Sequence, residues 1–195
     1  MYMTNNLFSL RIFLVFSVLF GFQIAAGSAI SYEEPKYTVV SEADTYEVRL
    51  YKNWTVAEVT SEPDNNGFRV LFDYISGANS GAQKLEMTIP VTQSNTNDKM
   101  IMRFFLPGEY SMQNAPEPTD TRVRIIDLPE QYFGVISYSG FASEGNFEKH
   151  HEELRMVLLN DGLVITGPPI KATYNSPFTP PFLRRNEAMY PLKLN

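Results

Sequence analysis

The order of apolar and polar positions along the chain predicts a protein built mainly of β-strands. Successive side chains of a strand point to opposite faces, so a half-buried strand shows an apolar residue at every second position. This alternation is clearest at residues 45–52, 54–60, 100–106, 121–128 and 131–140. It is weaker at KLEMTIPV (84–91), GLVITG (162–167), IKATYN (170–175) and EAMYPL (187–192).

Two segments carry helical spacing instead. The first has apolar residues at i, i+3, i+4 and i+7, which is one face of a helix: Phe68, Leu71, Phe72 and Ile75. Asp64 or Asn65 is expected to cap its start, and Gly77 to end it. The second predicted helix covers residues 143–160 and stops before Gly162. A proline-rich loop is expected at residues 106–120.

The two predicted helices lie in similar surroundings. Each follows a strand and precedes another, and a shift of 79 residues, from 68 to 147, aligns the two patterns. Such long-period similarity suggests a duplicated unit. We therefore expect an α+β fold in which two strand-helix-strand halves form one strongly twisted sheet or barrel, with two helices against it.

Residues 1–29 differ from the rest of the chain. A single basic residue, Arg11, precedes an apolar run at 12–22 and a small-residue exit at 27–29. This order is typical of a secretory signal peptide, and the run is shorter than the roughly 20 residues needed to span a bilayer. We expect residues 30–195 to form a single mature domain that is secreted and keeps no membrane anchor. Asn53-Trp54-Thr55 is then a usable N-glycosylation site, at Asn53.

Charge and cysteine content narrow the function. The formal net charge is −6, and the only basic pair in the late part of the chain is Arg184–Arg185, which argues against nucleic acid as a partner. The absence of cysteine excludes disulfides, zinc–thiolate sites and a cysteine nucleophile. No G-x-S-x-G elbow, phosphate-binding glycine loop or calcium loop is present. The sequence nominates no catalytic acid, base or nucleophile, so an enzyme is not expected.

The two histidines of the chain, His150 and His151, are adjacent on the second predicted helix. Neighbouring helix residues diverge by about 100°, whereas two ligands of one metal ion need a spacing of three or four. A shared metal site is therefore not expected. Two interpretations stay open: both histidines pack or are solvated, or one lines a ligand pocket as a haem iron ligand or a propionate donor.

Several stretches resemble the SOUL, or haem-binding protein, family. They are YEVRLYKNWTVAEV, FDYISGAN, KLEMTIPVTQ, GFASEGNFEKHHEELRMVL and TYNSPFTPPFLRRNEAMYPLK, and together they run from residue 37 to 193. The resemblance implies a distorted antiparallel β-barrel of two pseudo-repeated halves flanked by two α-helices. It also implies non-catalytic binding of haem or another porphyrin in a shallow apolar cleft, as in a secreted scavenger or carrier.

The same resemblance implies which residues line the cleft. From the first helix they are Phe68, Arg69, Leu71, Phe72 and Ile75, and from the late loop Tyr174, Pro177, Phe178, Arg184 and Arg185. Apolar and aromatic side chains would cover the porphyrin face, while arginines would pair with its propionates. Each residue also has an ordinary structural explanation, as helix core, loop-shaping residue or surface charge.

This chain departs from its relatives at two positions. Some relatives have a histidine between the early strand and the first helix, where residues 53–66 have none, and others have a lysine where this chain reads SPFTPPF. The remaining iron ligands are His150, His151, Met87 or a tyrosine, and a site without axial ligation is equally open. The alternative function is a protein-interaction module that keeps the fold and uses a groove or the 106–120 loop.

Overall fold

The computed structural model describes residues 32–62, 66–96 and 99–194. Every described residue belongs to one compact unit, Ser31–Asn195. The predicted signal peptide, residues 1–29, lies outside the described residues. Within the described ranges, no helix is both long enough and apolar enough to span a membrane.

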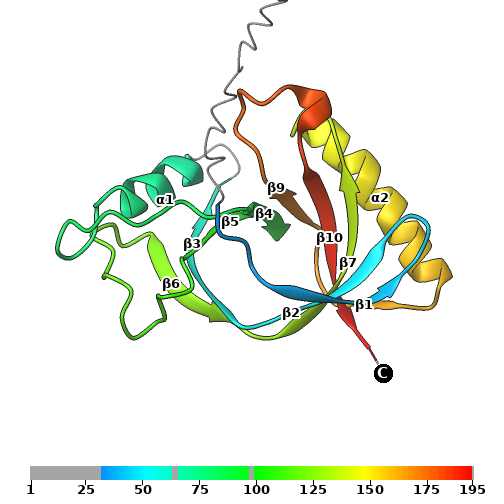
Figure 1. The fold of residues 1–195 in the computed structure, drawn as a ribbon, viewed down its shortest axis with the longest axis horizontal. Coiled ribbons are helices and arrows are strands. Elements are labelled where there is room, and N and C mark those ends of the chain that lie inside the picture. Colours follow the sequence, from blue (N-terminus) through cyan, green and yellow to red (C-terminus); the bar gives the residue numbers. More distant parts are fainter. Residues whose placement is uncertain (1–31, 63–65, 97–98, 195) are drawn as a thin grey trace, which may run out of the picture. The chain divides into compact units, whose positions relative to one another are not determined.

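This unit consists of one ten-stranded antiparallel sheet and two α-helices (Figure 1). In chain order, the elements are β1 (Tyr37–Glu42), β2 (Glu47–Tyr51), β3 (Trp54–Ser61), α1 (Gly67–Ile75), β4 (Val91–Thr96), β5 (Lys99–Phe105), β6 (Val123–Leu128), β7 (Gln131–Tyr138), α2 (Glu144–Asn160), β8 (Val164–Ile165), β9 (Ile170–Thr173), the short 3-10 helix η1 (Pro181–Leu183) and β10 (Asn186–Lys193).

The five clearest alternating segments are confirmed as β2, β3, β5, β6 and β7, and the last three weaker ones contain β8, β9 and β10. The prediction of a strand at residues 84–91 is wrong, because only the last of these residues, Val91, belongs to a strand. Its backbone bonds elsewhere: the Leu85 N–H donates to the Ile75 carbonyl at 2.8 Å and the Ile89 N–H to the Glu33 carbonyl at 3.0 Å. The exposed edge strand β1 was not predicted.

The strand order across the sheet is β1-β2-β7-β10-β9-β4-β5-β3-β6, and β8 pairs with β10. Outward from β4 come β5, β3 and β6, and outward from β9 come β10, β7 and β2. The sheet has ends at β1 and β6, so it curls into an open half-barrel (Figure 1). The predicted α+β class, with a curled antiparallel sheet and two helices, is confirmed; the origin of the halves in a repeat stays a prediction.

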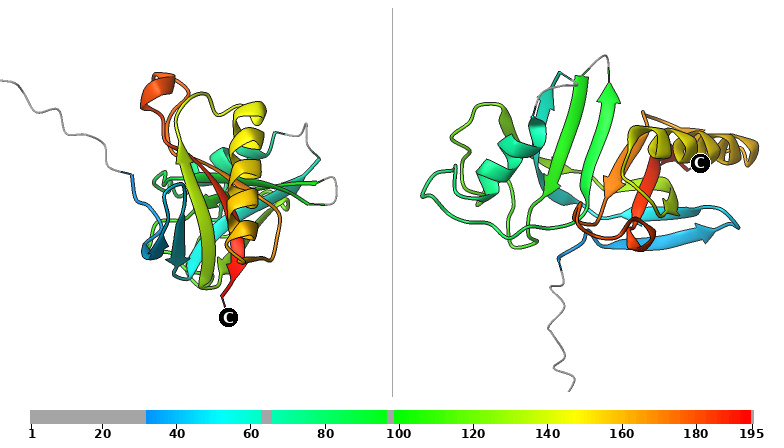
Figure 2. Two further views of the ribbon diagram at one scale, coloured as in Figure 1. Left: turned by 90° about the vertical axis from the view of Figure 1, so that its right-hand side faces the viewer. Right: turned by 90° about the horizontal axis from the view of Figure 1, so that it is seen from above.

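Both helices lie on the convex face of the sheet. α1 packs on β3, β5 and β6, and α2 packs on β7, β8 and β10. In the view from above, β4 and β5 pass between the two helices (Figure 2, right). The side chain of Asn66 caps α1 by accepting from the Arg69 N–H, and Ser143 caps α2 in the same way through the Asn146 N–H.

The core is divided by the sheet. Leu71 and Tyr74 of α1 pack in one convex cluster, and Leu154 and Leu158 of α2 in another. A third cluster, which includes Met189, lies on the concave face. Strand β10 shows the alternation that separates the clusters, since Ala188, Tyr190 and Leu192 pack with α2 while Glu187 and Met189 point to the opposite face.

Tyr138 offers a test of the α2 core. Among the described residues its buried hydroxyl has no hydrogen-bond partner, and burial raises the pKa of that hydroxyl to about 12. An unsatisfied buried hydroxyl costs about 1–3 kcal/mol. We expect Tyr138→Phe to raise the free energy of unfolding in urea by about 1 kcal/mol. Tyr174→Phe is the matched control, since it loses a 2.7 Å hydrogen bond to Glu187 and should be destabilised. A destabilised Tyr138→Phe would contradict this interpretation.

Candidate functional site

The outer side of α1 carries two exposed phenylalanines. Phe68 and Phe72 are 46% and 47% exposed, and their rings are nearly parallel, with centroids 6.1 Å apart and an interplanar angle of 11°. Phe68 also sets its edge against the buried ring of Phe104 on β5, at a centroid distance of 5.3 Å. These two half-exposed rings, here called the Phe68–Phe72 surface, lie on the β5 side of α1.

The other apolar residues predicted on this face lie in the core. Leu71 is fully buried and Ile75 is 5% exposed, and both pack in the cluster beneath α1 together with Val70 and Tyr74. The buried stripe of the helix is thus centred between Leu71 and Tyr74. Leu71 and Ile75 hold the helix on the sheet and do not face a ligand, which leaves Phe68 and Phe72 as the accessible part of the predicted set.

Arg69 lies beside this surface. Its side chain is 75% exposed, and its Nε is 3.9 Å from a carboxylate oxygen of Asp73, one turn further along α1. An exposed pair at that distance contributes little to stability. Arg69 is therefore able to bind an external anion at small cost.

The late loop, residues 175–185, also presents apolar side chains to water. Phe178 is 96% exposed, Phe182 76% and Leu183 64%. The loop is braced from inside by Arg184, whose guanidinium donates to the carbonyls of Pro177 at 2.6 Å and Thr179 at 2.7 Å. The predicted role of Arg184 as a propionate donor would require it to give up these bonds.

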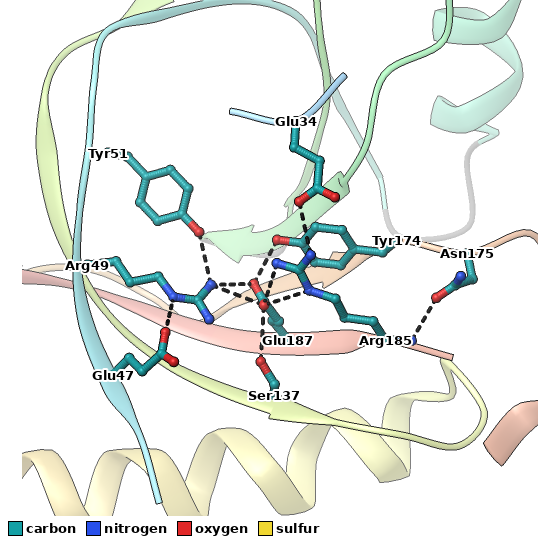
Figure 3. Close-up of polar contacts among 9 residues, drawn as sticks. All are labelled: Glu34, Glu47, Arg49, Tyr51, Ser137, Tyr174, Asn175, Arg185 and Glu187. Carbon is teal, nitrogen blue, oxygen red and sulfur yellow. Dashed lines mark hydrogen bonds and ion pairs between the residues drawn. The ribbon is translucent and has the colours of Figure 1, made fainter. Parts of the chain in front are cut away.

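Two more of the predicted ligand contacts, Tyr174 and Arg185, belong to a buried network around Glu187 (Figure 3). The Glu187 carboxylate is fully buried and accepts from Arg49 at 3.0 and 3.1 Å, Tyr174 at 2.7 Å, Ser137 at 3.1 Å and Arg185 at 3.0 Å. Burial and the nearby carboxylate raise the pKa of Tyr174 far above its ordinary value, so its hydroxyl stays a donor.

Two further carboxylates pair with the arginines of this network. Glu47 accepts from Arg49 at 2.6 Å, and Glu34 of the N-terminal segment accepts from Arg185 at 2.9 Å. The guanidinium of Arg185 also lies 3.7 Å from the centre of the Tyr174 ring. Through Glu187, Tyr174 and Arg185 therefore join β2, β7, β10 and the late loop to one another. Both side chains are engaged within the fold, and their contact with a ligand stays a prediction.

The two histidines of α2 have separate neighbours, as their spacing predicts. The His150 ring stacks on Tyr138 at 4.0 Å, and its Nδ1 lies 2.7 Å from the Asn146 carbonyl oxygen. The Nδ1 of His151 lies 3.0 Å from the Tyr190 hydroxyl. In the part of the chain that the structure describes, no group of three or more His, Cys, Asp or Glu side chains is arranged to hold a metal ion.

His151 and Met87 differ in their access to a ligand. His151 lines a hollow of about 130 Å³ beside β4 and β9, together with Phe147 and Lys171. Met87 is half-buried and packs against the core beneath α1. Of His150, His151 and Met87, His151 is the one that lines this hollow.

Sequence reasoning missed a pocket of about 180 Å³ on the concave face. None of the residues predicted to contact a ligand lines it. Its walls come from strands far apart in sequence, so only their pairing in the sheet brings them together. Its lining residues are Pro35, Tyr51, Lys52, Trp54, Thr92, Arg103, Phe105, Leu128, Pro129, Gln131, Phe133, Ile170 and Met189.

The fold combines a curled antiparallel sheet with a helix that exposes two aromatic rings. This combination defines a class of protein suited to binding an apolar ligand or a partner surface. The chain belongs to the SOUL heme-binding protein family, whose model matches residues 32–191. It is similar to human heme-binding protein 2, with 28% identity over 165 residues that cover 77% of this chain and 79% of the relative. Heme-binding protein 1 of Xenopus laevis is 27% identical over 184 residues, covering 89% and 94%.

Solved structures share the fold at much lower identity. The C-terminal domain of EcmrR superposes with a TM-score of 0.59 at 11% identity, covering 82% of this chain and 99% of that domain. A structure titled as a hydrolase from Listeria innocua gives 0.58 at 10% identity, covering 79% and 94%. At such identities these likenesses establish the architecture alone.

Proposed function

We propose that this chain binds haem or another tetrapyrrole on the Phe68–Phe72 surface of α1. The observation that carries the proposal is the pair of exposed, nearly parallel phenylalanine rings on a helix whose other apolar residues are buried. Large exposed aromatic surface on a folded protein is typical of a binding site. Membership of the SOUL heme-binding protein family supports a tetrapyrrole as the ligand.

The physical chemistry of this surface suits a porphyrin. Haem offers a flat apolar ring, an iron centre and two propionates. Phe68 and Phe72 remove one face of such a ring from water, and offset aromatic stacking adds about 0.5–1.5 kcal/mol per pair beyond the buried area. Arg69 lies within one turn of both rings and is suited to donate to a propionate.

Axial ligation is not required in this arrangement. Both histidines belong to α2, whereas the Phe68–Phe72 surface belongs to α1. We propose that affinity rests on the aromatic surface and on propionate charge. Metal-free porphyrins would then bind nearly as well as haem.

A haem titration of matched variants tests the site. We expect the double variant Phe68→Ala/Phe72→Ala to bind haem about 30-fold more weakly, which corresponds to about 2 kcal/mol. Phe182→Ala is the control, because Phe182 is 76% exposed but lies in the late loop. His150→Ala and His151→Ala should leave the dissociation constant within about threefold of the wild type. Loss of affinity in Phe182→Ala but not in the double variant would move the site to the late loop.

We propose a non-catalytic scavenging or carrying role in the secretory pathway. Residues 1–29 would act as a signal peptide, residues 30–195 would form the mature SOUL domain, and Asn53 would carry a glycan. In support, Asn53 is exposed between β2 and β3, where a glycan meets no core residue.

The glycan prediction has a direct test. Expressed with its natural N-terminus in a eukaryotic cell, the chain should appear in the medium with a mobility that peptide:N-glycosidase increases. Asn53→Gln should remove this shift and remain secreted. Recovery of the wild-type chain only from the cytosol would contradict both the signal peptide and the glycan.

A second candidate function is a protein-interaction module. Besides Phe178, Phe182 and Leu183, the neighbouring Phe141 is 64% exposed, and the Arg184 guanidinium lies 5.4 Å from its ring centre. This apolar surface favours the late loop over the 106–120 loop as the partner site. The module becomes the better account if the titration shows no saturable haem binding.

A further inference from the structure

The concave pocket lies on the opposite face of the sheet from both helices, and therefore apart from the Phe68–Phe72 surface. Strand register shows how it forms. Thr92 on β4 pairs with Arg103 on β5 and with Ala172 on β9, so these strands form a continuous floor. Ile170 of β9 and Met189 of β10 extend that floor on one side.

Aromatic side chains form the walls of this pocket. Phe105 of β5 and Trp54 of β3 stand on one side, and Tyr51 of β2 and Phe133 of β7 stand on the other. The Tyr51 and Phe133 rings meet edge to face, with centroids 5.6 Å apart. The Trp54 Nε1–H donates to the Leu106 carbonyl at 2.7 Å, which fixes the indole in place. Fixed aromatic walls of this kind favour an aromatic ring as the occupant.

On the β5 side of the pocket, the side chains carry a net positive charge. Glu58 is 2% exposed and is shared by two guanidinium groups: Arg103 donates to it through Nε at 2.8 Å, and Arg124 binds its other oxygen. One carboxylate thus faces two arginines, and Arg103 is the one that lines the pocket. Lys52 at the rim pairs with Glu130, so these two residues add no net charge.

We propose that this pocket is a second binding site, which takes a small aromatic carboxylate with its ring between the aromatic walls and its carboxylate on Arg103. The volume limits the size of the ligand. A cavity of about 150 Å³ accommodates a benzene ring, and sites for drug-sized ligands span about 300–1,000 Å³. At about 180 Å³, the pocket fits one ring with a short acidic arm and excludes a tetrapyrrole macrocycle.

The chain contains its own reporter for this site. Trp54 is the single tryptophan and forms part of the pocket wall. The probe is 3-phenylpropionate, which does not absorb where tryptophan is excited. Its matched controls are 3-phenylpropan-1-ol and 3-phenylpropylamine, which keep the ring and replace the carboxylate by a neutral group or a cation. We expect a saturable change of Trp54 emission with the acid, at least tenfold weaker binding of the alcohol, and no saturation with the amine.

Two arginine variants separate direct contact from loss of the Glu58 network. Arg103→Gln should weaken binding of the acid by about tenfold or more, because it removes a charge-assisted hydrogen bond from the pocket. Arg124→Gln removes the other partner of Glu58 but does not line the pocket, so binding should stay within about threefold. Equal losses in both variants would overturn the assignment of Arg103.

A filled pocket provides the decisive variant. Ile170→Phe occupies the floor and should abolish binding of 3-phenylpropionate while leaving the haem titration unchanged, since haem is proposed to bind on the opposite face. No saturable response of the wild-type chain up to millimolar acid would overturn the proposal, as would equal or tighter binding of the amine. Either result leaves the proposed tetrapyrrole site on α1 unaffected.

Discussion

Replacing Glu187 by glutamine is expected to lower the free energy of unfolding by about 3–5 kcal/mol, because removing one partner of a buried ion pair leaves the other charge uncompensated. Glu187 is fully buried and holds two guanidinium groups, those of Arg49 and Arg185. Glutamine keeps the shape of the side chain, but its NH2 group replaces an acceptor oxygen and faces residues that also donate hydrogen bonds. Urea denaturation measures the difference.

The control for this variant is a salt bridge at the surface. Lys52 and Glu130 form a 2.6 Å pair whose side chains are 60% and 47% exposed. Exposed pairs contribute about 0–1 kcal/mol, so Glu130→Gln should stay within about 1 kcal/mol of the wild type. If Glu187→Gln were as stable as Glu130→Gln, the buried network would not hold the late loop and β10 to the sheet as argued.

Replacing Leu71 by alanine is expected to cost about 2–5 kcal/mol of stability, through lost burial and the cavity left beneath α1. Leu71 is fully buried among the residues of the α1 core. The Leu71→Ala protein that remains folded should still bind haem, because its Phe68–Phe72 surface is intact. Urea denaturation and a haem titration on the same preparation measure the two effects.

Phe72→Ala should behave in the opposite way. Phe72 is 47% exposed, so its removal should change stability by less than about 1 kcal/mol while weakening haem binding several-fold. This reciprocal pattern separates the structural side of α1 from its binding side. If fully folded Leu71→Ala protein lost haem affinity, the buried Leu71 would contribute to haem binding together with Phe68 and Phe72, which would contradict this separation.

Local pattern predicted much of the fold. The alternation in residues 54–60 and 131–140 identified β3 and β7, and helical spacing identified α1 and α2. It misassigned residues 84–91, because an apolar run with a proline reads alike in a strand and in a buried extended segment. The exposed β1 carries no buried face, so its residues give no alternation to detect.

The site was harder to predict, since spacing does not show which way a helix is turned. Phe68, Leu71, Phe72 and Ile75 share one side of α1, yet the core takes Leu71 and Ile75 and leaves the two phenylalanines in water. Arg185 looked like a free cation in sequence, but its partner Glu34 is 151 residues away. Such a contact depends on how distant parts of the chain come together in the fold, and so does the concave pocket around Arg103.

The most direct test of the central claim locates the bound ring on the protein. Metal-free protoporphyrin would be titrated into the isotope-labelled chain while amide resonances are followed, because a porphyrin ring current shifts only nearby nuclei. The account predicts saturable shifts that are largest along Gly67–Ile75 and around Phe104 on β5. Shifts centred on residues 175–185 or on the concave pocket, or no saturable shift, would contradict it.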